Sequence, residues 1–128
     1  MRYRPSELIE VRQAGKKGRG VFARKKIRKG RVIERAPVVV MLVREIFGTG
    51  PRTTLADYVF SWSRGKVAFA CGYGALYNHS YEPNAVYHAG GARTQVFTAL
   101  RDIKAGEEIT VNYSGAPARR WKVAFTPV

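Results

Sequence analysis

Short apolar runs separated by glycine and proline are the feature that most constrains this chain. Residues 7–11 alternate polar and apolar side chains, as a half-buried strand does. Glycine-rich turns at residues 15–20 and 90–91 separate such segments. The pattern therefore predicts a mostly β chain. Further strands are predicted over residues 21–23, 31–34, 38–43, 67–71, 85–88, 94–98 and 108–113. Pro37 separates two of these strands.

Residues 55–64 change the period of the pattern. Counted from Leu55, apolar side chains fall at i, i+3, i+4 and i+7, which is the spacing of one helical face. Thr54 and Asp57 resemble a capping box, and Gly65 is a typical stop signal. The sequence therefore predicts one short helix over residues 55–64.

Two segments of the chain, residues 21–33 and 96–109, echo each other. Each combines predicted strands with a turn of the form Ile-x-x-Gly, at residues 27–30 and 103–106. A glycine at the end of such a turn adopts a positive φ without strain. The echo predicts two similar β-hairpin elements that pack together.

Cysteine and histidine are too few for several kinds of site. Cys71 is the only cysteine, which excludes an intramolecular disulfide and a cysteine-based zinc cluster. His79 and His88 are the only histidines, so no His-rich metal site is expected. The longest apolar run, residues 38–43, is far shorter than the roughly 20 residues of a membrane span, and the N-terminus lacks a signal peptide pattern. We therefore expect one intracellular domain with no metal and no membrane contact.

Positive charge is concentrated in the first half of the chain. The formal net charge is +14, and residues 12–35 hold 11 basic side chains and one acidic side chain. Such a field attracts polyanions and acidic partners. Three interpretations stay open for it: contact with nucleic acid, contact with an acidic protein surface, and a solubilising face.

Residues 76–84 are rich in small polar side chains between apolar neighbours. A Ser–His hydrolase is disfavoured, because the adjacent His79 and Ser80 do not normally face each other and no G-x-S-x-G elbow exists. Residues 18–20 lack the third glycine of a dinucleotide-binding fingerprint and follow no βαβ pattern.

Three motifs taken in order resemble the SET-domain protein lysine methyltransferases. They lie at residues 17–23, 77–84 and 106–113, and the resemblance spans about residues 8–113. The chain is similar to the minimal single-domain SET proteins of viral or prokaryotic type. The resemblance implies a β-clip fold of small curled sheets with one short helix. It also implies a C-terminal pseudoknot, in which the chain at residues 78–79 threads beneath a C-terminal loop.

The same resemblance implies S-adenosylmethionine as cofactor and a protein lysine ε-amine as methyl acceptor. In the family, Asn78 would bind the amino-acid end of the cofactor, and His79 would contact the adenine through its backbone. Glycine at position 18 would allow close backbone approach. The implied cofactor-binding residues are Lys17, Gly18, Arg19, Asn78, His79 and Tyr113.

Tyr113 is the implied catalytic residue, with its hydroxyl directed to the cofactor methyl and the incoming amine. A phenol of pKa about 10 is protonated at neutral pH, so it would position and stabilise rather than act as a strong base. Tyr58 is a second catalytic candidate, although a core tyrosine explains it equally well. Further channel candidates are Phe69, Cys71 and Tyr73. The tail at 114–128, including Trp121, would cover the site.

The expected partner is a protein substrate, either a histone or another nucleic-acid-associated protein. By analogy with the small viral enzyme we expect a homodimer, located in the cytoplasm if prokaryotic and otherwise at chromatin. The alternative function is a non-catalytic basic β-clip module that binds nucleic acid or an acidic partner through residues 12–35. Asn78, His79 and Tyr113 discriminate the two, because a binding module has no use for them.

Overall fold

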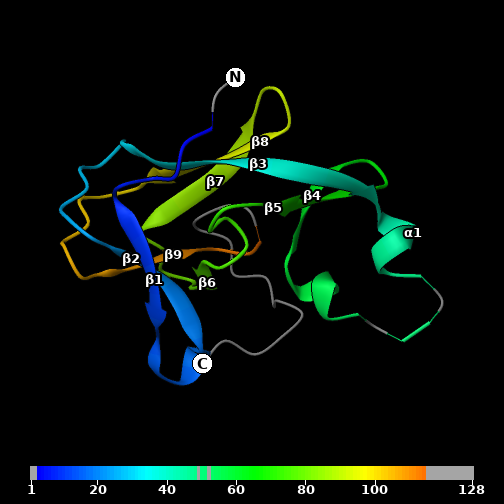
Figure 1. Ribbon diagram of the computed structural model, residues 1–128, viewed down its shortest axis with the longest axis horizontal. Coiled ribbons are helices and arrows are strands. Elements are labelled where there is room, and N and C mark those ends of the chain that lie inside the picture. The colour runs from blue at the N-terminus through cyan, green and yellow to red at the C-terminus, as the bar shows by residue number, and fades with distance from the viewer. Residues whose placement is uncertain (1–2, 49, 52, 115–128) are drawn as a thin grey trace.

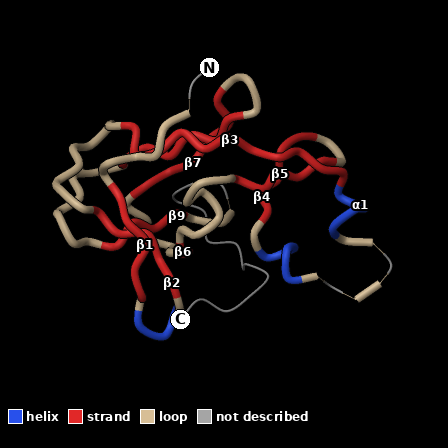
Figure 2. The backbone as a smooth tube through the Cα atoms, viewed as in Figure 1, coloured by secondary structure: helices blue, strands red, loops and turns tan. Residues whose placement is uncertain are grey.

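Two small curled sheets make up most of the protein. The computed structural model describes residues 3–48, 50–51 and 53–114 (Figure 1). One sheet has the strand order β1-β2-β9-β6 and the other has the order β4-β5-β3-β8-β7 (Figure 2). The predicted mostly β fold with one short α-helix is confirmed. The elements are β1 (Ile9–Gln13), the 3-10 helix η1 (Gly15–Lys17), β2 (Arg19–Ala23), β3 (Val32–Leu42), α1 (Val43–Ile46), the 3-10 helix η2 (Thr54–Asp57), β4 (Val59–Ser63), β5 (Lys66–Ala70), β6 (Asn78–His79), β7 (Ala85–Gly90), β8 (Thr94–Ala99) and β9 (Glu108–Val111).

The helix predicted over residues 55–64 is wrong. Only the 3-10 turn η2 forms there, and β4 follows it directly. Val59, Phe60 and Trp62 prefer strands, and Gly65, with φ of 72°, makes the hairpin turn to β5 instead of ending a helix. The single described α-helix is α1, which begins at Val43, a residue predicted to end a strand.

Strand β3 is continuous, although Pro37 was predicted to separate two strands. Its first half pairs with β8 as far as Pro37 opposite Thr94, and its second half pairs with β5 from Val38 onward. Proline has no N–H to give to a ladder, so it is tolerated where one pairing ends and another begins. Pro37 therefore marks the passage from one neighbouring strand to the other.

The two echoed segments pack against each other, but the predicted β-hairpins are wrong. Strands β2 and β3 flank the first turn and β8 and β9 flank the second, and each turn passes the chain from one sheet to the other, so the flanking strands do not pair. Ile27 and Ile103 form an isolated antiparallel bridge, with reciprocal N–H to C=O distances of 2.9 and 2.8 Å. Gly30 and Gly106 have φ of 85° and 86°. The Gly30 N–H donates to the Ala99 carbonyl, and the Gly106 N–H donates to the Ala23 carbonyl, both at 2.8 Å. The two turns are thus related by a local pseudo-two-fold axis.

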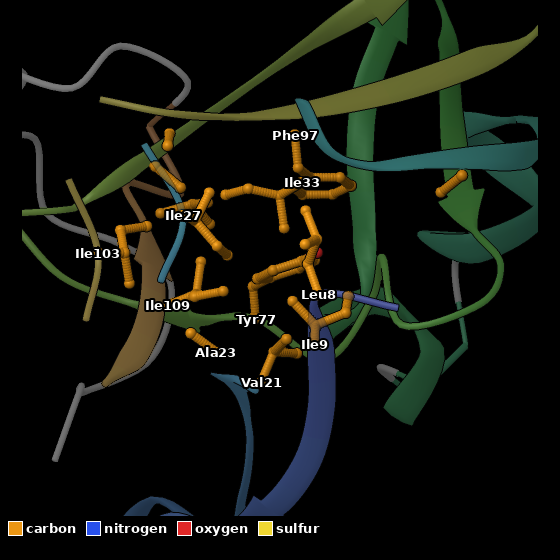
Figure 3. Close-up of a cluster of buried hydrophobic side chains, with 14 of the residues drawn as sticks. Leu8, Ile9, Val21, Ala23, Ile27, Ile33, Tyr77, Phe97, Ile103 and Ile109 are labelled. Atoms are coloured by element: carbon orange, nitrogen blue, oxygen red, sulfur yellow. The ribbon is translucent and has the colours of Figure 1, made fainter. Parts of the chain in front are cut away.

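One hydrophobic core joins the two sheets (Figure 3). The side chains of Ile27, Ile103 and Ile109 are fully buried in it. The buried ring of Tyr77 stacks on Phe97 with centroids 4.3 Å apart. Tyr77 immediately precedes β6. Its packing in the core therefore fixes the position at which Asn78 and His79 begin.

Strand β9 lies between β2 and β6. It runs parallel to β6, with Asn78 opposite Thr110 and His79 opposite Val111. Buried Asn84 binds the backbone of β9. Its Oδ1 accepts the Thr110 N–H at 2.9 Å, and its Nδ2 donates to the Glu108 carbonyl at 2.8 Å. The C-terminal part of the predicted pseudoknot lies beyond residue 114, outside the described residues.

Candidate functional site

Tyr113 lies two residues after the end of β9 and is held by the segment that carries β6. Its hydroxyl donates to the Tyr77 carbonyl at 2.5 Å, and its backbone N–H donates to Nδ1 of His79 at 3.0 Å. Burial raises the pKa of the Tyr113 phenol, and the nearby Tyr58, Tyr87 and Glu108 raise it further. The phenol is therefore neutral at physiological pH and can act only as a hydrogen-bonding group.

Two other tyrosines accompany Tyr113. Tyr58 follows η2, is 39% exposed, and contributes electrostatically to the raised pKa of the Tyr113 phenol. The Tyr87 hydroxyl donates to the Tyr113 carbonyl at 3.3 Å. The sequence analysis missed Tyr87, because a tyrosine within a short strand carries no motif signal.

Asn78 and residues 17–19 are brought together around Glu108. Nδ2 of Asn78 donates to the Arg19 carbonyl at 3.0 Å and to Oε2 of Glu108 at 2.7 Å. Nζ of Lys17 donates to Oε1 of the same carboxylate at 3.1 Å. Glu108 was missed as a site residue, although a carboxylate at the start of a buried strand was a signal for it. It ties two predicted cofactor-binding segments into one site.

Two glycines of the same segment serve different purposes. A Cβ on Gly20 would lie 2.5 Å from Oε2 of Glu108 and 2.8 Å from Nδ2 of Asn78, so a larger residue would displace the Glu108 and Asn78 side-chain ends from their present contacts. Gly18 has φ of 81°, and the space where its Cβ would stand is open. The backbone at Gly18 is accessible to a close-lying ligand, which fits the cofactor that the resemblance implied.

His79 is buried, with 5% of its surface exposed. Its Nδ1 accepts a hydrogen bond, so the proton of the neutral ring is on Nε2. Nε2 is buried, and none of the described residues offers it a hydrogen-bond partner. Burial lowers the pKa of the imidazole, and its ring packs edge-on against Tyr81 with centroids 4.4 Å apart. His79 is thus a neutral residue whose Nδ1 positions the Tyr113 backbone and whose Nε2–H remains as a buried donor.

The channel candidates lie on the segment that follows β4. Phe69 and Cys71 are half-buried, and Tyr73 is exposed. The Tyr73 N–H donates at 3.0 Å to Oε2 of the buried Glu34, and Oε1 of that carboxylate accepts the Tyr77 hydroxyl at 2.8 Å. Burial raises the pKa of Glu34. Glu34, another residue that the sequence analysis missed, therefore anchors the turn that leads into β6.

Within the described ranges, no group of three or more His, Cys, Asp or Glu side chains could hold a metal ion. In the same ranges, no helix is long and apolar enough to cross a membrane. The expectation that Trp121 and the C-terminal tail cover the site concerns residues outside the described ones.

Comparison with known proteins identifies the family of this chain. The family model of the SET domain matches residues 18–114. The H3 lysine-37 specific histone-lysine N-methyltransferase of Schizosaccharomyces pombe is 35% identical over 106 residues, which cover 82% of this chain and 72% of that protein. The chain belongs to the SET-domain family, a class of protein-lysine N-methyltransferases.

Two further relatives differ in how much they share. Human histone-lysine N-methyltransferase 2B is 35% identical over 118 residues, which are 84% of this chain but only 4% of that protein. The crystal structure of a Plasmodium falciparum protein, proposed to be a histone methyltransferase, superposes with a TM-score of 0.69 at 28% identity. That match covers 86% of this chain and 94% of the Plasmodium chain.

Proposed function

We propose that this protein transfers a methyl group from S-adenosylmethionine to a lysine ε-amine of a histone at chromatin. The observation that carries the proposal is the anchored Tyr113 phenol, which lies beside the cluster formed by Asn78, Glu108 and residues 17–19. Two relatives that are named histone-lysine methyltransferases support the substrate class.

The residues of this cluster would hold the cofactor. When bound, S-adenosylmethionine supplies a methyl group on a cationic sulfur, which an amine can take in one displacement. The open backbone at Gly18 would allow close approach, and the Asn78 carboxamide oxygen would accept from the amino-acid end. Lys17 neutralises Glu108, so the site does not present a bare carboxylate.

Tyr113 would act on the acceptor amine. Its neutral phenol is fixed by the Tyr77 carbonyl, so the hydroxyl oxygen keeps lone pairs that can orient an amine N–H. A lysine ammonium of pKa about 10.4 must lose a proton before it can attack, and desolvation among Tyr58, Tyr87 and Tyr113 lowers that pKa. The proton passes to solvent, because the phenols stay protonated and no residue here is a strong base. Positioning would then supply most of the rate.

The test combines cofactor titration with methyl transfer. Calorimetry measures binding of S-adenosylmethionine, and labelled cofactor is then incubated with recombinant histones, followed by mass spectrometry of the modified lysine. Histones whose lysines were acetylated beforehand provide the control, because their amines cannot attack. We expect cofactor binding and labelling of the unmodified histones only. If the protein binds the cofactor but labels no protein, the methyltransferase function is wrong and the alternative, a non-catalytic binding module, takes its place.

A further inference from the structure

The two pseudo-symmetric turns carry different charges on the same backbone. In the second turn, Arg101 forms an ion pair with Glu107, whose Oε1 also accepts the Lys104 N–H at 3.0 Å. The local two-fold relation places Lys25 where the second turn has Arg101, and Arg31 where it has Glu107. The first turn therefore holds two cations at positions that form an ion pair in the second.

The positive charge of the first turn is not needed for folding. Residues 24–31 contain six basic side chains and no acidic one, and all six are exposed. The second turn forms the same backbone with mixed charges, because the buried isoleucine and the terminal glycine specify it. The one ion pair found here among the described residues joins Lys26 to Asp102 at 3.9 Å, with both side chains largely exposed. Such a pair contributes little to stability.

Lys25 and Arg31 also line a hollow of about 390 Å³, together with Arg4 and Arg35. We call it the basic hollow. Glu7 and Glu34 also line it, so four basic side chains stand against two acidic ones. The oxygens of the Glu34 carboxylate already accept from the Tyr77 hydroxyl and the Tyr73 N–H. The turn and the hollow therefore adjoin each other and share Lys25 and Arg31. The turn is the blue loop that lies beside the gold loop of the second turn in Figure 1.

The chemistry of this surface fits a nucleic acid better than a protein. Protein interfaces are built around aromatic and apolar anchors. The only large apolar residue of the turn is Ile27, which is fully buried, and the described exposed large hydrophobics include none between Arg4 and Val38. Several cations spread along a turn match the repeated charges of a phosphate backbone.

We propose that residues 24–31 and the basic hollow bind the phosphate backbone of duplex nucleic acid, with one phosphate between Lys25 and Arg31. That phosphate would neutralise Lys25 and Arg31 together, whereas in the second turn the Glu107 carboxylate neutralises Arg101. Binding would be independent of base sequence, because contacts to phosphates carry no sequence information. The surface would bring the methyltransferase to substrates that are bound to nucleic acid.

The experiment measures binding of fluorescent duplex DNA of two unrelated sequences to the full chain by anisotropy over a range of salt. The test variant carries Lys25→Gln, Arg28→Gln and Arg31→Gln. The matched control carries Lys66→Gln, Arg44→Gln and Arg64→Gln, which removes the same charge from exposed positions elsewhere. No cofactor is present, so the result does not depend on methyl transfer, and thermal unfolding confirms that both variants fold.

We expect the two sequences to bind equally and the test variant to bind on the order of tenfold or more weakly. Each lost phosphate contact lowers the slope of log affinity against log salt by about 0.9, so the test variant loses up to about 3 in slope. The control keeps the slope of the parent. Equal losses in both variants would overturn the proposal, because binding would then follow net charge alone.

Two further arms exclude other ligands. A polyglutamate peptide that binds through the same three residues, while DNA does not bind, would make the partner an acidic protein and overturn the proposal. Displacement of DNA by low millimolar inorganic phosphate at constant ionic strength would make the site one for free phosphate and would likewise overturn it. We expect neither effect.

Discussion

The turn at residues 24–31 and the turn at residues 100–107 have the same backbone and lead to different parts of the molecule. The first continues into β3, which crosses to the five-stranded sheet. The second continues into β9, and Tyr113 lies two residues beyond the end of that strand. Glu108 at the start of β9 binds Asn78 and Lys17, and the equivalent position after the first turn is Val32, which cannot.

The difference between the turns separates what folding requires from what function requires. The two isoleucines and the two glycines are shared, and they make the bridge and the positive φ values. Every other side chain of the turns is free to differ. After the second turn, the residues that differ form part of the candidate active site. We infer that the residues that differ in the first turn bind nucleic acid.

The largest expected effect tests the isoleucines that the two turns share. Ile27→Ala and Ile103→Ala should each lower the free energy of unfolding by about 2–5 kcal/mol, because both side chains are fully buried and leave a cavity. Urea denaturation followed by circular dichroism measures the loss. The two losses should agree within about 1 kcal/mol if the turns are equivalent in the core. A small loss at one of the two positions would contradict the pseudo-symmetry.

The next effect concerns the end of the second unit. Tyr113→Phe removes the hydroxyl that donates to the Tyr77 carbonyl but keeps the ring. Turnover should fall on the order of 10²-fold or more, with little change in cofactor affinity, because the hydroxyl acts mainly in the transition state. Single-turnover methylation and a cofactor titration measure the two quantities.

Tyr3→Phe is the matched control for this variant. The Tyr3 hydroxyl also forms a hydrogen bond, to Oγ1 of Thr94 at 2.5 Å, but Tyr3 lies at the N-terminal segment. It should leave turnover unchanged. Methylation by a folded Tyr113→Phe protein at the parent rate would remove Tyr113 from the catalytic role.

A smaller effect is expected at the hydrogen bond between Asn78 and Glu108, which has no equivalent after the first turn. Asn78→Ala removes the amide that bonds Glu108 and the Arg19 carbonyl, and it should weaken cofactor binding by roughly 1.5–3 kcal/mol. Gln13→Ala is the control, since the exposed Gln13 amide also bonds a carbonyl of the neighbouring turn, that of Gly15. Unchanged cofactor binding by a folded Asn78→Ala protein would place Asn78 outside the binding site.

Local features of this fold could be predicted from the sequence, and pairings could not. Gly90 and Gly91 mark the β7–β8 hairpin because a turn needs only its own residues. The helix predicted from Leu55 failed because four apolar positions fit a helical face by coincidence, and pairing of β4 with β5 decided the outcome. Nothing local distinguishes those two possibilities.

The residues of the candidate site also fall into those that local motifs predict and those that only long-range contacts bring together. Asn78 and Tyr113 were predicted through motifs, because their residue types recur at recognisable spacings. Tyr87, Glu34 and Glu108 gain their roles from partners that are 26, 43 and 30 positions away in the chain. Which of these side chains meet depends on the parallel pairing of β6 with β9, a long-range contact that no periodicity encodes.

The smallest effect separates the two turns by pH. The pKa of Glu107 is lowered to about 2, first by its hydrogen bond with Arg101 and also by the Lys104 N–H. A carboxylate whose pKa is lower in the folded state stabilises above its unfolded pKa of about 4.3, and that contribution is lost as pH falls toward 2. The pair is partly exposed, so the contribution is less than about 1 kcal/mol.

Glu107→Gln should therefore be slightly less stable than the parent at pH 7, and the difference should disappear between about pH 5 and pH 2. Arg31→Gln is the control at the equivalent position, for which the described residues show no ion pair, so its difference from the parent should stay constant over that range. Thermal unfolding at several pH values measures both. A pH-dependent difference for Arg31→Gln would mean that a carboxylate already pairs with the first turn. The site inferred for a phosphate between Lys25 and Arg31 would then be occupied by the protein itself.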